Sequence, residues 1–143
     1  MVEYYINECN TQIKAIIDIT TLDIEDIKAA RSKNIFDRAE TKEKLLKSFQ
    51  SNKATLDNEL LKIHTNSNTD NIKDLLSTKE NQLIVELRDN IANLKELNSK
   101  YMKFVMSVNE FYSSLLGNIL PQEPTGYSGK SVTSPASILK VDI

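Results

Sequence analysis

The feature that most constrains this chain is a long stretch without glycine or proline. Residues 1–116 contain neither, and the three glycines and three prolines all follow, at positions 117, 121, 124, 126, 129 and 135. Average usage of about 12% would place roughly 14 of them in such a stretch. Helices exclude glycine for its backbone entropy and proline for its missing N–H, whereas β-rich domains need both in their turns. The body of the chain is therefore predicted to be helical.

The spacing of apolar residues points to the same fold class. Apolar side chains recur at steps of three and four in three segments, which places them on one helical face. The pattern predicts helices over about residues 2–31, 35–64 and 71–120, and spacing near 3.5 residues favours coiled-coil packing. We expect an all-α fold: an elongated antiparallel helical hairpin or three-helix coiled-coil-like bundle over residues 1–120, with a flexible C-terminal tail over 121–143.

The boundaries between these helices are less clearly marked. Asn34 is a candidate N-cap for the second helix, although the same region is equally compatible with a kink in one long helix. Small polar residues from 65 to 70 predict a loop. Ser77 and Glu80 have the spacing of a capping box, so residues 71–76 form either the start of the third helix or a separate turn.

Three polar residues interrupt the apolar stripes. Lys42 and Lys53 fill gaps in the second stripe, where we expect their stems to lie along the seam while their charges reach water. Asn98 lies within the third stripe. A polar residue there fixes the register of packed helices at a cost in stability.

Charge and hydropathy indicate a cytoplasmic protein that binds neither nucleic acid nor a membrane. Lys and Arg number 18 and Asp and Glu 20, a net charge of −2, so the basic stripe that nucleic acids or anionic lipids require is missing. No secretory signal and no apolar run of about 18 residues is present, so we expect no stable membrane insertion. The single cysteine, Cys9, lies on an apolar stripe and is expected to be a small core residue.

The sequence offers no constellation for catalysis. His64 is the only histidine, which excludes a bundle di-iron site, and it is expected to complement the dipole at the end of the second helix. Residues 126–131 resemble a phosphate-binding loop, but two residues stand where that loop needs four. We therefore predict a protein that is not an enzyme, with no catalytic residue, metal site or cofactor.

The end of the third predicted helix carries more apolar residues than one stripe requires. Twelve of the 20 residues from 101 to 120 are apolar or aromatic. Broad apolar surface on a helix marks a partner site, although a wider core or a homodimer seam would also use it. The candidate partner-binding residues are Tyr101, Phe104, Val105, Val108, Phe111, Tyr112, Leu115, Leu116 and Ile119.

The tail adds one candidate residue of a different kind. Tyr127 stands among turn-forming residues with no apolar neighbour to bury it. A single aromatic residue in a flexible segment is a candidate docking residue that orders only on binding.

Four short segments of the chain resemble a known family, the FlgN family of flagellar type III export chaperones. They are Lys-Glu-Lys-Leu-Leu at 42–46, Leu-Lys-Glu-Leu-Asn at 94–98, Gln-Glu-Pro-Thr-Gly-Tyr at 122–127 and Lys-Val-Asp-Ile at 140–143. The family's Asn-Gly pair, which follows the Leu–Asn step, falls on Tyr101-Met102 here.

The resemblance implies a cytoplasmic chaperone without catalysis. It implies that the end of the third helix binds and shields the C-terminal helical segments of hook–filament junction proteins, which are FlgK- or FlgL-like hook-associated proteins. It also implies that Tyr127 docks on the cytoplasmic domain of the export-gate protein FlhA. The alternative is a structural coiled-coil adaptor that forms a homodimer and has no export client.

Overall fold

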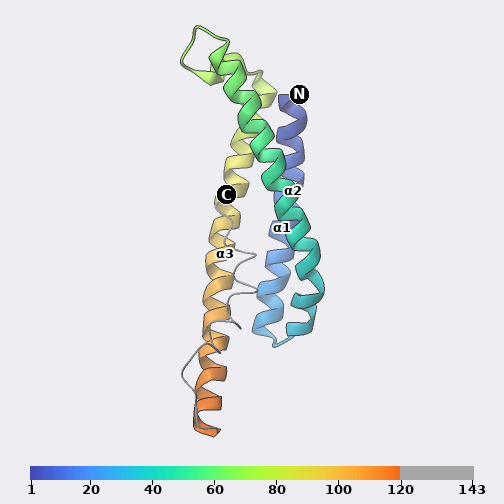
Figure 1. The fold of residues 1–143 in the computed structure, drawn as a ribbon, viewed down its shortest axis with the longest axis vertical. Coiled ribbons are helices and arrows are strands. Elements are labelled where there is room, and N and C mark those ends of the chain that lie inside the picture. Colours follow the sequence, from blue (N-terminus) through green and yellow to red (C-terminus); the bar gives the residue numbers. More distant parts are fainter. Residues whose placement is uncertain (120–143) are drawn as a thin grey trace.

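Three long helices and one short 3-10 turn make up the part of the chain that the structure describes. The structure is a computed structural model that describes residues 1–119, with side chains to Gly117. Its elements are α1 (Val2–Lys28), α2 (Ser32–Thr65), η1 (Ile72–Leu75) and α3 (Thr78–Ile119), and this range holds no strand. α1 and α2 form an antiparallel hairpin, and α3 returns alongside α1 in the same direction as α1 (Figure 1). The predicted elongated, all-α bundle is confirmed.

α1 and α2 are separate helices, joined by a tight turn. The Arg31 N–H bonds to the Asp26 carbonyl at 2.8 Å, and the Ala30 N–H bonds to the Ile27 carbonyl at 3.3 Å. This pair of bonds is the Schellman arrangement, in which the residue after the C-cap takes a left-handed conformation. Ala30 does so, with φ of 59°. α1 consequently ends before the expected residue 31, α2 begins before the expected residue 35, and Asn34 lies inside α2 rather than capping it.

A separate turn precedes α3, as one of the two alternatives predicted. The Ser77 N–H donates to Glu80 Oε1 at 2.9 Å, and the Glu80 N–H donates to Ser77 Oγ at 3.1 Å. These reciprocal bonds form a capping box that starts α3 at Thr78 instead of residue 71. Residues 72–75 form η1, which opens with the Asn71 side chain accepting a hydrogen bond from the Lys73 N–H at 3.2 Å.

The main core lies where the apolar stripes of the three helices meet. Cys9 is part of it, as predicted, and burial raises the pKa of its thiol to about 11. Each large aliphatic side chain fully buried in such a core contributes about 1.5–3 kcal/mol. The buried members of the core are Val2, Ile6, Cys9, Ile13, Ile16, Leu46, Phe49, Leu56, Leu76, Leu87 and Leu94.

A buried asparagine on α1 links α1 to α3. The Asn10 side chain donates to the Leu83 carbonyl at 3.2 Å and accepts a hydrogen bond from Asn90 Nδ2 at 3.1 Å. Since a polar group buried in a seam must keep its partners, these bonds hold the two helices in one register. Asn98, predicted to have this role, is half-buried, and its Oδ1 atom is buried without a hydrogen-bond partner.

Candidate functional site

The last part of α3 extends beyond the helices that cover the rest of it (Figure 1). α1 has 27 residues and α3 has 42, which correspond to lengths of about 40 and 63 Å. The two helices are in contact along the whole of α1. Near the start of each helix, Glu3 of α1 forms an ion pair with Lys79 of α3 at 2.8 Å, and at the end of α1, Lys28 Nζ lies 5.0 Å from the centroid of the Phe104 ring of α3. α1 therefore ends beside Phe104. We call residues 106–117 of α3, which lie past this point, the free end.

A small second core holds α3 just before the free end begins. Tyr101 and Val105 are 3% and 7% exposed, and they pack with Ile24 of α1. Lys42 Nζ of α2 lies 5.1 Å from the centroid of the Tyr101 ring, within the range of a cation–π interaction. Burial, with the added effect of the Asp23 charge, raises the pKa of Tyr101 to about 12. Both α1 and α2 thus hold α3 at this level.

The expectation that the Lys42 charge reaches water is wrong. Its side chain is 4% exposed, and Nζ donates to Asp23 Oδ2 at 3.2 Å. Burial lowers the pKa of Lys42, and the Asp23 carboxylate opposes that effect. Asp23 also accepts a hydrogen bond from Arg38 Nε at 3.0 Å. The buried charges of Lys42 and Asp23 therefore each have a partner of opposite charge inside the bundle. Lys53 does behave as predicted, reaching the surface and pairing with Asp57 at 3.1 Å.

A second acidic residue ties the turn between α1 and α2 together. Asp26 Oδ1 accepts from Arg31 Nε at 2.7 Å, and its other oxygen accepts from Arg38. The hydrogen bonds from Arg38 and Arg31 lower the pKa of Asp26 to about 2. These charge-assisted contacts hold the turn in place opposite the free end of α3.

The predicted partner-binding residues differ widely in their burial in the structure. Tyr101 and Val105 are buried, and Phe104 and Val108 are half-buried. Ile119 is the last residue of α3, and its side chain lies outside the described part, as does Tyr127. The exposed members of the set are Phe111 at 64%, Tyr112 at 54%, Leu115 at 43% and Leu116 at 37%.

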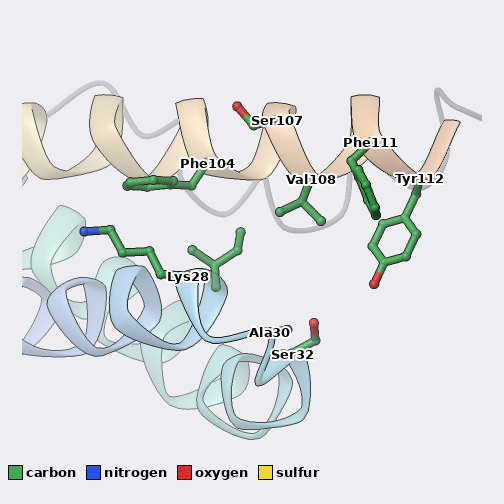
Figure 2. A pocket seen from close by; sticks show the side chains of 9 residues that line it. Lys28, Ala30, Ser32, Phe104, Ser107, Val108, Phe111 and Tyr112 are labelled. Carbon is green, nitrogen blue, oxygen red and sulfur yellow. The ribbon is translucent and has the colours of Figure 1, made fainter. Parts of the chain in front are cut away.

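An apolar groove of about 440 Å³ lies between the free end and the turn that joins α1 to α2. Figure 2 shows Phe104, Val108 and Phe111 pointing from α3 towards this turn, whereas Ser107 points away from it. The rings of Phe111 and Tyr112 pack edge to face, with their centroids 5.8 Å apart. We call this the terminal groove; its lining residues are Ile27, Lys28, Ala30, Ser32, Phe104, Ser107, Val108, Phe111 and Tyr112.

Five of the nine residues that line the terminal groove were not among the predicted site residues, and one of them, Ser107, lies on α3 itself. Ile27, Lys28, Ala30 and Ser32 come from the end of α1, the turn and the start of α2. Ile27 belongs to the apolar stripe of α1, but nothing in the local sequence indicates that this turn faces the third helix. A heptad alignment that paired α1 with α3 in parallel would have found the α1 residues.

The chemistry available here is that of apolar contact. The terminal groove has one charged lining side chain, Lys28, and Glu110 is the one charged residue between positions 104 and 119. Within residues 1–119, no group of His, Cys, Asp and Glu side chains has the geometry to hold a metal ion. None of the described helices has an apolar stretch long enough to cross a bilayer. The arrangement suits an apolar stripe on another polypeptide segment.

Comparison of the chain with protein-family models, curated proteins and solved structures gives no match.

Proposed function

We propose that this protein is a chaperone that binds an amphipathic helical segment of another protein, its client, and shields that segment until it is handed on. The observation that carries the proposal is the free end of α3, where Phe111, Tyr112, Leu115 and Leu116 are exposed beside an apolar groove. Exposed apolar surface of this kind is typical of a binding site.

The geometry supports recognition of a helix along the free end. Phe111 and Leu115 are one helical turn apart on the side of α3 that carries Phe104 and Val108, so Leu115 extends the groove-lining face past the turn. A client helix lying along this face would contact them with residues spaced at three and four. Binding would cover rings and branched side chains that the described part of the chain leaves exposed.

The more specific proposal concerns the identity of the client. The segment Gln-Glu-Pro-Thr-Gly-Tyr at 122–127 resembles the tail of the FlgN family, which favours FlgK- or FlgL-like hook–filament junction proteins as clients. On this proposal the protein acts in the cytoplasm, and Tyr127 docks on the cytoplasmic domain of the export-gate protein FlhA. Residues 122–127 lie outside the described residues, so the support for this step is their sequence alone.

Calorimetry with a defined client segment tests the proposal. The probe is the C-terminal helical segment of a FlgK- or FlgL-like protein. Phe111→Asp combined with Leu115→Asp is expected to weaken binding at least roughly tenfold, since it removes two exposed anchors while circular dichroism stays helical. The matched control is Val85→Asp, which alters a residue of the same helix that is 55% exposed at the opposite end of the bundle. We expect the control to bind like the wild type. Equal affinity in all three proteins would contradict the proposal.

Tyr127→Ala tests the docking step separately. We expect it to leave the affinity for the client segment unchanged, because the client surface lies on α3, and to weaken binding to the FlhA cytoplasmic domain. Calorimetry with each partner measures both effects. Unchanged affinity for the FlhA domain would remove this role from Tyr127.

A homodimerising coiled-coil adaptor is the second candidate. It is favoured by the near absence of charge on the free end, which would let two copies of the same surface meet without repulsion. Light scattering separates the two. A chain that is monomeric alone and forms a one-to-one complex with the client segment supports the chaperone, and a tight dimer that excludes the client supports the adaptor.

A further inference from the structure

The terminal groove places two demands on whatever fills it. Its walls are mostly apolar, from Ile27 on α1 to Phe104, Val108 and Phe111 on α3, and its one charged lining residue is Lys28. An occupant must therefore bring several aliphatic side chains and gains from a carboxylate near Lys28.

One segment of this same chain has that composition. Residues 138–143 read Ile-Leu-Lys-Val-Asp-Ile, so four of six are large and aliphatic, and Asp142 supplies a carboxylate. Between positions 121 and 137, Val132 is the only aliphatic residue larger than alanine. In an extended conformation, residues 139, 141 and 143 point to one side, so Leu, Val and Ile would enter the groove together.

The connection between α3 and this segment is long enough to reach back. Residues 120–137 form an 18-residue connection, with a maximal span of about 60 Å. Val108 lies 11 residues before Ile119, which is about 17 Å along α3. A random chain of 18 residues has a root-mean-square span of roughly 23 Å, close to the required distance. The effective concentration of the segment at the groove is then of the order of millimolar.

We propose that residues 138–143 dock in the terminal groove of their own chain and that a client must displace them. Leu139 and Val141 fill the groove between α3 and the turn. A contact with an intrinsic dissociation constant of about 1 mM would already occupy about half of the molecules at such an effective concentration. The displacement step rests on the proposed chaperone function, whereas the docking itself does not.

Paramagnetic relaxation tests the docking without any client. A nitroxide is attached to the full chain through Ser137→Cys; Cys9 is fully buried and its thiol pKa is raised to about 11, so the new cysteine reacts selectively. We expect broadening of the Ile27 and Val108 methyl signals and none at Val85. Leu139→Asp combined with Val141→Asp should abolish that broadening while circular dichroism stays unchanged.

The controls separate the other occupants. Absence of broadening at Val108, or broadening that persists in the double aspartate variant, would overturn the docking. Isotope-labelled chain without nitroxide, mixed with nitroxide-labelled chain of natural isotope content, should show no broadening at Val108; broadening in this mixture would mean that a second copy fills the groove, which also overturns the proposal.

Calorimetry with the client segment tests the displacement step. Deleting residues 138–143 should raise client affinity about twofold or more, since the fraction of open grooves rises. Unchanged affinity would overturn displacement. If no form of the chain binds the client, the proposed function fails, and the relaxation experiment still decides the docking.

Discussion

The two parts of α3 differ less in sequence than in what lies beside them. Leu94 is fully buried between α1 and α2, whereas Phe111 on the same helix is 64% exposed. Both belong to one continuing apolar pattern. α1 ends at Lys28, next to Phe104, and with it ends the cover over α3. The comparison teaches that the length of α1, rather than the composition of α3, determines where the apolar face of α3 becomes exposed.

The largest expected effect compares a leucine from each part. Leu94→Ala should lower the free energy of unfolding by roughly 3–5 kcal/mol, because it leaves a cavity in the core. Leu116→Ala, on the free end, should change it by about 0.5 kcal/mol. Urea unfolding followed by circular dichroism measures both. Similar losses at the two positions would break the distinction between the covered part and the free end.

The next prediction concerns the buried charges of Asp23 and Lys42, which lie beside Tyr101 of α3. Asp23→Asn should destabilise the fold by about 3 kcal/mol, since it leaves the buried Lys42 without its carboxylate partner. Asp18→Asn, at an exposed position of the same helix, is the matched control and should have little effect. Urea unfolding of both variants measures the difference. If Asp23→Asn behaved like its control, the buried pair of Asp23 and Lys42 would contribute little to the stability of the fold.

A smaller, stabilising effect is expected at the turn that ends α1. Ala30→Gly should raise the free energy of unfolding by about 0.5–1 kcal/mol, because glycine takes a left-handed conformation without the steric cost that alanine bears. Ala29 has φ of −93°, so Ala29→Gly should bring no gain. Thermal unfolding compares the two. A gain at position 29 and none at position 30 would contradict the assigned turn geometry.

A further prediction concerns the pH dependence of that turn. The folded-state pKa of Asp26 is about 2, below its ordinary value of 3.8, because of hydrogen bonds from Arg38 and Arg31. The stabilisation is therefore complete above about pH 4 and is lost as the pH falls towards 2. The melting temperature of the wild type should fall over this range more steeply than that of Asp26→Asn. Parallel curves for the two proteins would show that Asp26 is not coupled to folding.

The sequence was sufficient for the helices and insufficient for their ends and contacts. The missing glycines and prolines and the regular apolar steps predicted the all-α bundle. The turn at residues 29–31 was placed too late because Ala30 occupies the position where glycine is the usual signal. Burial of the Lys42 charge depends on Asp23, 19 positions away on another helix, which no local pattern reveals.

The candidate site could be predicted only in part, because a local pattern shows which residues are apolar but not which of them other helices cover. The exposed residues of the free end, from Phe111 to Leu116, were found through their unusual apolar density. Tyr101 and Val105 have the same character but are buried, because Ile24 and Lys42 happen to reach them. Periodicity identifies a face of a helix. It does not show how far along that face the neighbouring helices extend.

Hydrogen–deuterium exchange along α3, with and without the client segment, tests the central claim most directly. We predict that amides of residues 106–117 exchange at least tenfold faster than those around Leu94 in the free chain, because neighbouring helices cover only the earlier part. Saturation with the client segment should slow exchange at 106–117 and leave the region around Leu94 unchanged. Equal protection of both regions in the free monomer, or no slowing at 106–117 in the presence of saturating client, would contradict the account.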